Sequence, residues 1–268
     1  MLDINTEFGT EASVWLRILP IMLVFSVIYV IALITGHLLW KEYENLVWHE
    51  KCNFASVVAA VGFSIYVGYN SVVAIYTTNV WVAHDTSLTS YDDLTMHIVE
   101  VFLGYMVFDS VLLLYNNVKN QSFNQFMQYL FHHMAAVLAY HIMVKSGQGM
   151  PMGMMGAVTE ITSPMLHFKW ILEKSGYKNS GPYVVNGTLF MLGFLFFRVV
   201  LGSWVSYTFV FGQDAQLATL GAYKYYMFYL TYGVALLLQY FWFYKILKGY
   251  YKGVSAFLKG PSVDKKTL

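Results

Sequence analysis

Residues 16–39 read LRILPIMLVFSVIYVIALITGHLL. This run contains one charged side chain, that of Arg17, and it exceeds the roughly 20 residues that an α-helix needs to cross a hydrocarbon core about 30 Å thick. A chain in hydrocarbon must satisfy its backbone hydrogen bonds internally. The run therefore predicts a transmembrane helix.

Further apolar windows of similar length follow along the chain, at 54–76, 96–115, 126–145, 150–172, 183–209 and 223–247. The whole composition agrees, because 57% of the residues are hydrophobic, 12% are charged, and the mean hydropathy is +0.51. A transmembrane β-barrel would need shorter stretches of alternating polarity, and these do not dominate. We expect an all-α polytopic membrane protein with about seven transmembrane helices.

Charge and cysteine content exclude several classes of function. The formal net charge is +1, and no basic block is large enough to compete for a nucleic-acid backbone. Cys52 is the sole cysteine, which excludes an intramolecular disulfide and a zinc site built on thiolates. No glycine-rich phosphate loop or metal-binding motif is present, so we expect no cofactor or metal.

The distribution of basic residues predicts the orientation. If the N-terminus lies outside, the inner connections and tail hold eleven lysines, whereas the outer side holds only Arg17, Lys145 and Lys224. Cytosolic loops carry the excess of lysine and arginine. We therefore expect a lumenal N-terminus and a cytosolic C-terminus.

The last four residues, Lys265-Lys266-Thr267-Leu268, resemble the dilysine retrieval signal of endoplasmic reticulum membrane proteins. A basic tail attracted to anionic lipid is the simpler alternative. With a cytosolic C-terminus, the pattern favours residence in the endoplasmic reticulum.

Several ionisable residues fall inside the predicted spans. Each costs about 3 kcal/mol at the bilayer centre on insertion scales, so each needs a partner or a purpose. The set comprises Asp109 on the third span, His132, His133 and His141 on the fourth, Glu160 and His167 on the fifth, and Arg198 on the sixth.

The depths of these residues follow from the helical rise. Four of them lie five to seven positions from the inner ends of their spans, about 7 to 11 Å below the cytosolic boundary. These four are Asp109, His132, His133 and His167. Glu160 would lie about 10 Å deeper, and Arg198 deeper again, where it could pair with Glu160 or reach the outer interface. The set predicts a polar cavity that opens toward the cytosol.

A structural role competes with a functional one at each position. His141, near the outer interface, is more simply a residue that hydrogen-bonds two helices. His132 and His133 point about 100° apart, so one helix interface cannot use both, which favours a functional role for the pair. Asp109 and Glu160 fit either role, and Arg198 is more simply a structural counter-ion.

Five motifs together resemble the signature of the TLC-domain family, which contains the ceramide synthases and a group of smaller TLC-domain proteins. The matching pieces are Gly104-Tyr105-Met106-Val107-Phe108-Asp109, His132-His133, the run from Glu160 to Trp170, Arg198, and Phe241-Trp242-Phe243-Tyr244-Lys245-Ile246. The resemblance covers residues 48–252. It leaves 1–47 as an N-terminal tail with the first transmembrane helix, and 253–268 as a basic cytosolic tail.

The resemblance implies that six of the helices form a barrel around a lipid-accommodating tunnel, with the paired histidines near its cytosolic mouth. In the enzymes of the family, a histidine of the pair serves acyl transfer from acyl-coenzyme A, the co-substrate to expect here if the protein is an enzyme. His132, His133 and Asp109 would then be catalytic, and Glu160, His167 and Arg198 would line the tunnel.

Two departures separate the chain from parts of the family. Smaller TLC-domain proteins usually carry asparagine and arginine where this chain has His167 and Lys169. Ceramide synthases carry a histidine and aspartates after the double histidine, where this chain has Glu160 and His167.

Three interpretations follow. The leading one is a membrane protein of lipid homeostasis that binds or acylates a membrane lipid in an intramembrane tunnel. The second is an acyl-coenzyme A-dependent acyltransferase of the ceramide synthase type. The third is a receptor, transporter or trafficking adaptor without chemistry.

Tags at residue 2 and after residue 268 should be protected on opposite sides of the membrane, because an odd number of spans separates them. The sequon Asn120-Gln121-Ser122 should remain unglycosylated, because its connection is predicted to face the cytosol. Protease protection and a glycosidase shift measure both outcomes. A glycan on Asn120 would overturn the predicted orientation.

Overall fold

The computed structural model describes residues 10–77, 93–117, 123–178, 180–211, 218–219 and 221–259. All the regular elements of these ranges are helical. They are α1 (Glu11–Leu39), η1 (Lys41–Asn45), α2 (Trp48–Thr77), α3 (Asp93–Asn117), α4 (Phe123–Ser146), α5 (Met150–Val158), η2 (Thr159–Thr162), α6 (Ser163–Lys174), α7 (Gly181–Gly193), η3 (Phe194–Val200), α8 (Leu201–Val205), η4 (Ser206–Phe211) and α10 (Ala222–Lys259).

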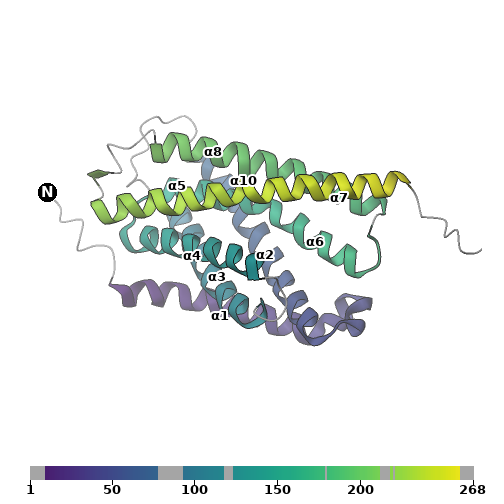
Figure 1. Cartoon of the computed structure of the whole chain (residues 1–268). Helices are drawn as coiled ribbons and strands as arrows, with labels where there is room; N and C mark the ends of the chain where they lie inside the picture. Colours follow the sequence, from purple (N-terminus) through teal and green to yellow (C-terminus); the bar gives the residue numbers. More distant parts are fainter. Residues whose placement is uncertain are drawn as a thin grey trace, which may run out of the picture.

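These elements join into seven helical rods within the described residues, because α5, η2 and α6 run on without a break, as do α7, η3, α8 and η4. Figure 1 shows the rods packed as one bundle, with the start of α1 and the end of α10 at opposite ends of it. The all-α polytopic fold is confirmed.

Five of the described helices are long and apolar enough to cross a membrane. They are Glu11–Leu39, Trp48–Thr77, Asp93–Tyr115, Gly181–Thr208 and Ala222–Leu258. The two other rods, α4 and α5–η2–α6, carry His132, His133, Glu160 and His167. The predicted site thus lies largely on the two rods whose membrane character is weakest by length and composition.

Two rods depart from the regular α-helices that the apolar windows predicted. Pro164 stands in the first turn of α6, where its ring would clash with the carbonyl of Glu160 in a continuing α-helix, and the chain forms the 3₁₀ turn η2 there. The next rod contains two π-helical segments, η3 and η4. Glu160 and His167 therefore do not lie on one regular α-helix, because Glu160 lies in η2 and His167 in α6.

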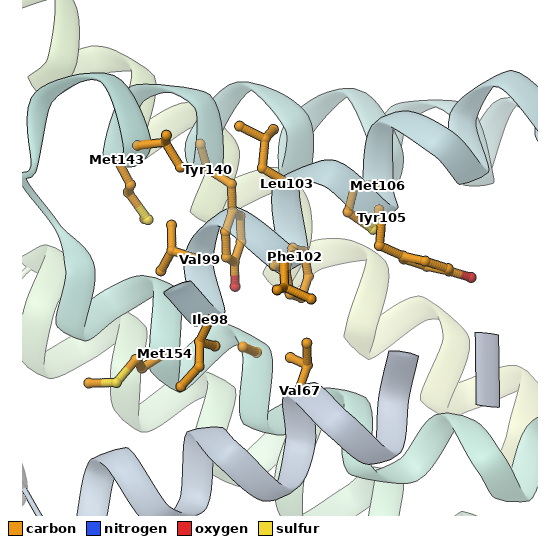
Figure 2. Close-up of a cluster of buried hydrophobic side chains, with 14 of the residues drawn as sticks. Val67, Ile98, Val99, Phe102, Leu103, Tyr105, Met106, Tyr140, Met143 and Met154 are labelled. Atoms are coloured by element: carbon orange, nitrogen blue, oxygen red, sulfur yellow. The ribbon is translucent and has the colours of Figure 1, made fainter. Parts of the chain in front are cut away.

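The core of the bundle lies among α1, α2, α3, α4 and α5. Figure 2 shows part of it, in which Phe102 of α3 and Tyr140 of α4 lie near Val99 and Met143. The rings of Phe102 and Tyr140 stack at a centroid distance of 3.9 Å. The turn from α4 to α5 uses Gly147 at a φ of 66°, a conformation that glycine adopts without a steric penalty.

Helix α1 is fastened to the bundle by polar contacts at its start. The Arg17 guanidinium lies 3.1 Å from the Glu100 carboxylate and donates to the Val144 carbonyl oxygen at 3.2 Å. Glu11 accepts from Lys145 and lies 3.2 Å from His141 Nε2. His141 thus joins two helices, the structural role that its position favoured.

At its other end, α1 turns into η1 around a buried aromatic residue. The Tyr43 hydroxyl donates to the Leu33 carbonyl oxygen at 2.6 Å, and its ring packs edge-on against Phe54. Burial raises the pKa of the Tyr43 hydroxyl above its usual value. The turn between α1 and η1 is therefore fixed by packing as well as by chain connectivity.

Most of the described lysines gather at the end of the bundle where α1 ends and α2 begins, which we call the lysine-rich end. Among them are Lys41, Lys51, Lys174, Lys178, Lys245, Lys248 and Lys252. Lys145, beside Glu11 of α1, and Lys224, near the start of α10, lie at the other end. Helix α10, with 38 residues, is about 57 Å long and projects beyond the other rods there (Figure 1). The Asn120 sequon and the Lys265-Lys266 pair lie outside the described residues.

Helices α1 and α3 approach closely at Gly104, where an added Cβ would lie 2.8 Å from Ile21 Cγ2. Gly104→Ala should therefore lower stability by about 1 to 3 kcal/mol through overpacking, measured as a lower melting temperature in mild detergent. Gly62→Ala is the matched control, because an added Cβ there meets nothing within 4 Å. Equal melting temperatures for the two variants would contradict the packing of α1 on α3.

Candidate functional site

All six predicted site residues line one cavity of about 650 Å³, which reaches the lysine-rich end at His49, Glu50, Lys174 and Lys245. Its wall comes from α2, α3, α4, α6, α7, α10 and the irregular elements η2 and η3. We call it the mouth cavity. The site residues that it gathers are Asp109, His132, His133, Glu160, His167 and Arg198.

His133 is held by both of its ring nitrogens. Nδ1 lies 2.8 Å from the Tyr129 carbonyl oxygen and Nε2 lies 2.8 Å from Asp109 Oδ2. A carbonyl oxygen only accepts, so Nδ1 must carry a proton and donate it. A second proton then lies between Nε2 and the carboxylate. His133 consequently has no ring nitrogen left for a ligand, and its place is fixed between α3 and α4.

His132, the neighbouring residue, is in the opposite situation. Its ring packs edge-on against Trp242 at 5.2 Å and against His133 at 5.7 Å. Its Nδ1 atom is buried and has no hydrogen-bond partner among the described residues. A buried polar atom without a partner costs about 1 to 3 kcal/mol. His132 is therefore the member of the pair with a ring nitrogen that no other described residue occupies.

A second polar cluster surrounds Arg198, which is itself buried. Its guanidinium lies 3.1 Å from Glu160 Oε2 and donates to Thr162 Oγ1 at 2.9 Å and to Ser163 Oγ at 2.8 Å. The Ser163 hydroxyl donates in turn to Glu160 Oε2 at 2.6 Å. Of the two destinations open to Arg198, the structure has it pair with Glu160.

The irregular backbone explains how these groups meet. Glu160 lies on η2, Ser163 directly follows it, and Arg198 lies on η3. A 3₁₀ turn and a π-helical segment each change the direction of side chains relative to an α-helix. His167, one turn into α6, lines the same cavity but belongs to neither cluster.

A second cavity of about 110 Å³ adjoins the first and shares His132, Glu160 and Arg198 with it. We call it the deep cavity. It lies among α4, α5, α8 and α10, and apolar side chains dominate its wall, among them Ala135, Ala136, Phe102, Met155, Val205 and Leu236. The three shared residues therefore form a polar junction between a wide cavity and a narrow apolar one.

Sequence reasoning missed several polar residues of this region. Thr162 and Ser163 sit inside the quoted family motif but read as ordinary helix residues, and Gln239 was hidden in an apolar window. Their neutral side chains carry no charge that would mark them. Among the residues that the structure describes, no group of three or more His, Cys, Asp or Glu side chains is placed to hold a metal ion.

Comparisons with known proteins agree with this architecture. The model of the TLC domain family matches residues 47–248, from just before α2 to near the end of α10. No solved structure matches the chain.

Named relatives are TLC domain-containing proteins. The human TLC domain-containing protein 4 is 29% identical over 103 residues, 38% of this chain and 37% of that protein. The Danio rerio TLC domain-containing protein 2 is 25% identical over 117 residues, 44% of this chain and 46% of that protein. The Danio rerio TLC domain-containing protein 4-B is 25% identical over 170 residues, 63% of each chain. The matched part thus covers less than two thirds of each of these relatives. Because the family model spans most of the chain, including every residue of the two clusters, the protein belongs to the TLC-domain family.

Proposed function

We propose that this protein serves lipid homeostasis by binding a membrane lipid, with the polar part in the mouth cavity and hydrocarbon in the deep cavity. The observation that carries the proposal is the junction of the two cavities at His132, Glu160 and Arg198. A site that is polar at one end and apolar at the other matches an amphiphile. A volume of about 650 Å³ lies within the usual range of ligand pockets.

The distribution of charge supports the proposal that the polar part of the lipid lies in the mouth cavity. Lys174 pairs with Glu50 at the rim of the mouth cavity, and Lys245 lies over the Phe241 ring at 5.4 Å. Further inside, the charged groups are already paired with one another, Asp109 with His133 and Glu160 with Arg198. A bound lipid therefore does not have to neutralise an isolated charge, which favours an uncharged polar group at the junction.

Acyl transfer is the chemistry that the unpaired His132 favours. A neutral imidazole can take the proton of a lipid hydroxyl or amine while that group attacks the thioester carbonyl of acyl-coenzyme A. The thiolate leaves with the electron pair of the broken C–S bond and recovers the proton from His132. In this scheme Asp109 and His133 hold α4 against α3, and His132 acts on the substrate.

We place the protein in the endoplasmic reticulum with the lysine-rich end toward the cytosol. The gathering of most described lysines at one end supports this orientation. In it, the mouth cavity opens to the side where acyl-coenzyme A is available, and the Lys265-Lys266 tail would be readable as a retrieval signal.

Filling the deep cavity should remove bound lipid. Gly202 lines this cavity, and a Cβ added to it meets nothing within 4 Å, so Gly202→Phe places a ring in empty space. Lipids that co-purify in mild detergent, counted by mass spectrometry, should fall severalfold relative to wild type. Gly233→Phe is the matched control, because Gly233 has the same free space but lines neither cavity. Equal lipid content in the two variants would contradict the proposed lipid site.

The two histidines should respond differently to removal. His132→Ala should lower the melting temperature less than His133→Ala does, because Nδ1 has no hydrogen-bond partner to lose, and should change the acyl composition of cellular lipids. His133→Ala should cost about 0.6 to 1.7 kcal/mol of stability, because it breaks the bond to Asp109 between two helices.

Melting curves and lipid profiles of the same preparations separate the two roles. Asp109→Asn keeps an acceptor for His133 and should lower stability less than His133→Ala. Unchanged lipid profiles together with a large loss of stability in His132→Ala would reverse the assignment of the pair.

A further inference from the structure

Gln239 of α10 is a buried polar residue that neither the sequence motifs nor the two clusters account for. Its side chain is 8% exposed, and its Oε1 atom has no hydrogen-bond partner among the described residues. It lines the deep cavity, as does His132, whose Nδ1 atom is also unpartnered. Two residues that each carry an unsatisfied buried polar atom therefore line one mainly apolar cavity.

Other polar side chains on the same wall are satisfied by their own helices. The hydroxyl of Thr159 donates to the Gly156 carbonyl at 2.7 Å, that of Ser206 to the Gly202 carbonyl at 2.9 Å, and that of Thr231 to the Met227 carbonyl at 2.8 Å. The contrast matters because an unmade buried hydrogen bond is costly. The unpartnered atoms of Gln239 and His132 can therefore form hydrogen bonds with a molecule bound in the cavity.

The two atoms define the chemistry of that group. A carbonyl oxygen such as Gln239 Oε1 only accepts, so its partner must be a donor. Nδ1 of a neutral imidazole either donates or accepts, depending on the tautomer. A hydroxyl satisfies both, because it donates one proton and accepts with its oxygen. An ether or a bare alkyl chain cannot donate to Gln239.

We propose that Gln239 and His132 together select a lipid that carries a hydrogen-bond donor, such as a hydroxyl, in the deep cavity. The inference rests on the proposed lipid site and names its specificity-determining residue. When the donor is the ligand hydroxyl, its oxygen accepts from Nδ1–H of His132. That bond fixes the tautomer in which Nε2 is unprotonated and able to act as a base.

A competition experiment tests the selection. Purified full-length protein in nanodiscs is equilibrated with equimolar 1-dodecanol and 1-methoxydodecane, and the bound ratio is counted by native mass spectrometry. The two probes share one dodecyl chain and differ in the donor. Wild type should favour the alcohol. In Gln239→Leu the ratio of alcohol to ether should fall about tenfold, the effect of one buried hydrogen bond. Because both proteins sit in the same bilayer, partitioning of the probes cancels in the comparison.

Two further variants sharpen the result. Gln239→Met, which is unbranched, should repeat the loss of preference if packing is not its cause. Gln128→Leu is the matched control, because Gln128 lines only the mouth cavity and accepts from Trp242 Nε1 at 3.2 Å, so the ratio should stay at the wild-type value. The melting temperature of Gln239→Leu should stay the same or rise, since the substitution removes an unsatisfied group.

The outcomes distinguish this inference from the function on which it rests. Wild type that binds both probes without preference, or a Gln239→Leu protein that keeps the wild-type ratio, overturns the role of Gln239 and leaves the lipid site standing. Wild type that binds neither probe contradicts the lipid site itself. A preference lost in Gln128→Leu as strongly as in Gln239→Leu assigns the selection to the mouth cavity and overturns the inference.

Discussion

The ion pair between Glu160 and Arg198 is the interaction on which the interior of this protein depends. An unpaired charge at that depth would cost several kcal/mol, and the two side chains avoid this cost together with Thr162 and Ser163. Bringing them together requires backbone that an α-helix does not supply. Pro164 interrupts the α-helical hydrogen bonds and produces η2, and the facing rod contains the π-helical segment η3. The irregular turns and the buried pair therefore explain each other.

The remaining polar groups of the site are of two kinds, those that have hydrogen-bond partners and those that lack one. Asp109, His133 and the Tyr129 carbonyl satisfy one another and tie α3 to α4. His132 lies one residue away, about 100° around the helix, and is left with an unpaired nitrogen at the junction of two cavities. In the proposed function, this nitrogen forms a hydrogen bond with the bound lipid.

Much of this arrangement follows from the sequence, and its limits have physical causes. Apolar windows of transmembrane length predicted the helices, and the cost of charges in hydrocarbon marked the six residues that line the mouth cavity. Helical rise alone could not show which histidine is paired, because that depends on the rotation of α4 against α3. The apolar windows did not predict η2, although Pro164 was a visible signal for it. They did not predict the π-helical segments either, and no residue signals those as plainly. Gln239 carries no charge, so only the three-dimensional cavity reveals it.

In the proposed function, the cavity beside His132 holds the hydrocarbon of a lipid. A fatty acid with a diazirine at its chain end, photo-activated on wild-type protein in nanodiscs, measures this directly when the labelled peptides are sequenced. We expect labels on the cavity-lining segments 132–140 of α4 and 231–239 of α10, at residues such as Ala136 and Ala235. Labels confined to exposed side chains on the outside of the bundle, such as Leu23, Val27 and Val30, would contradict it.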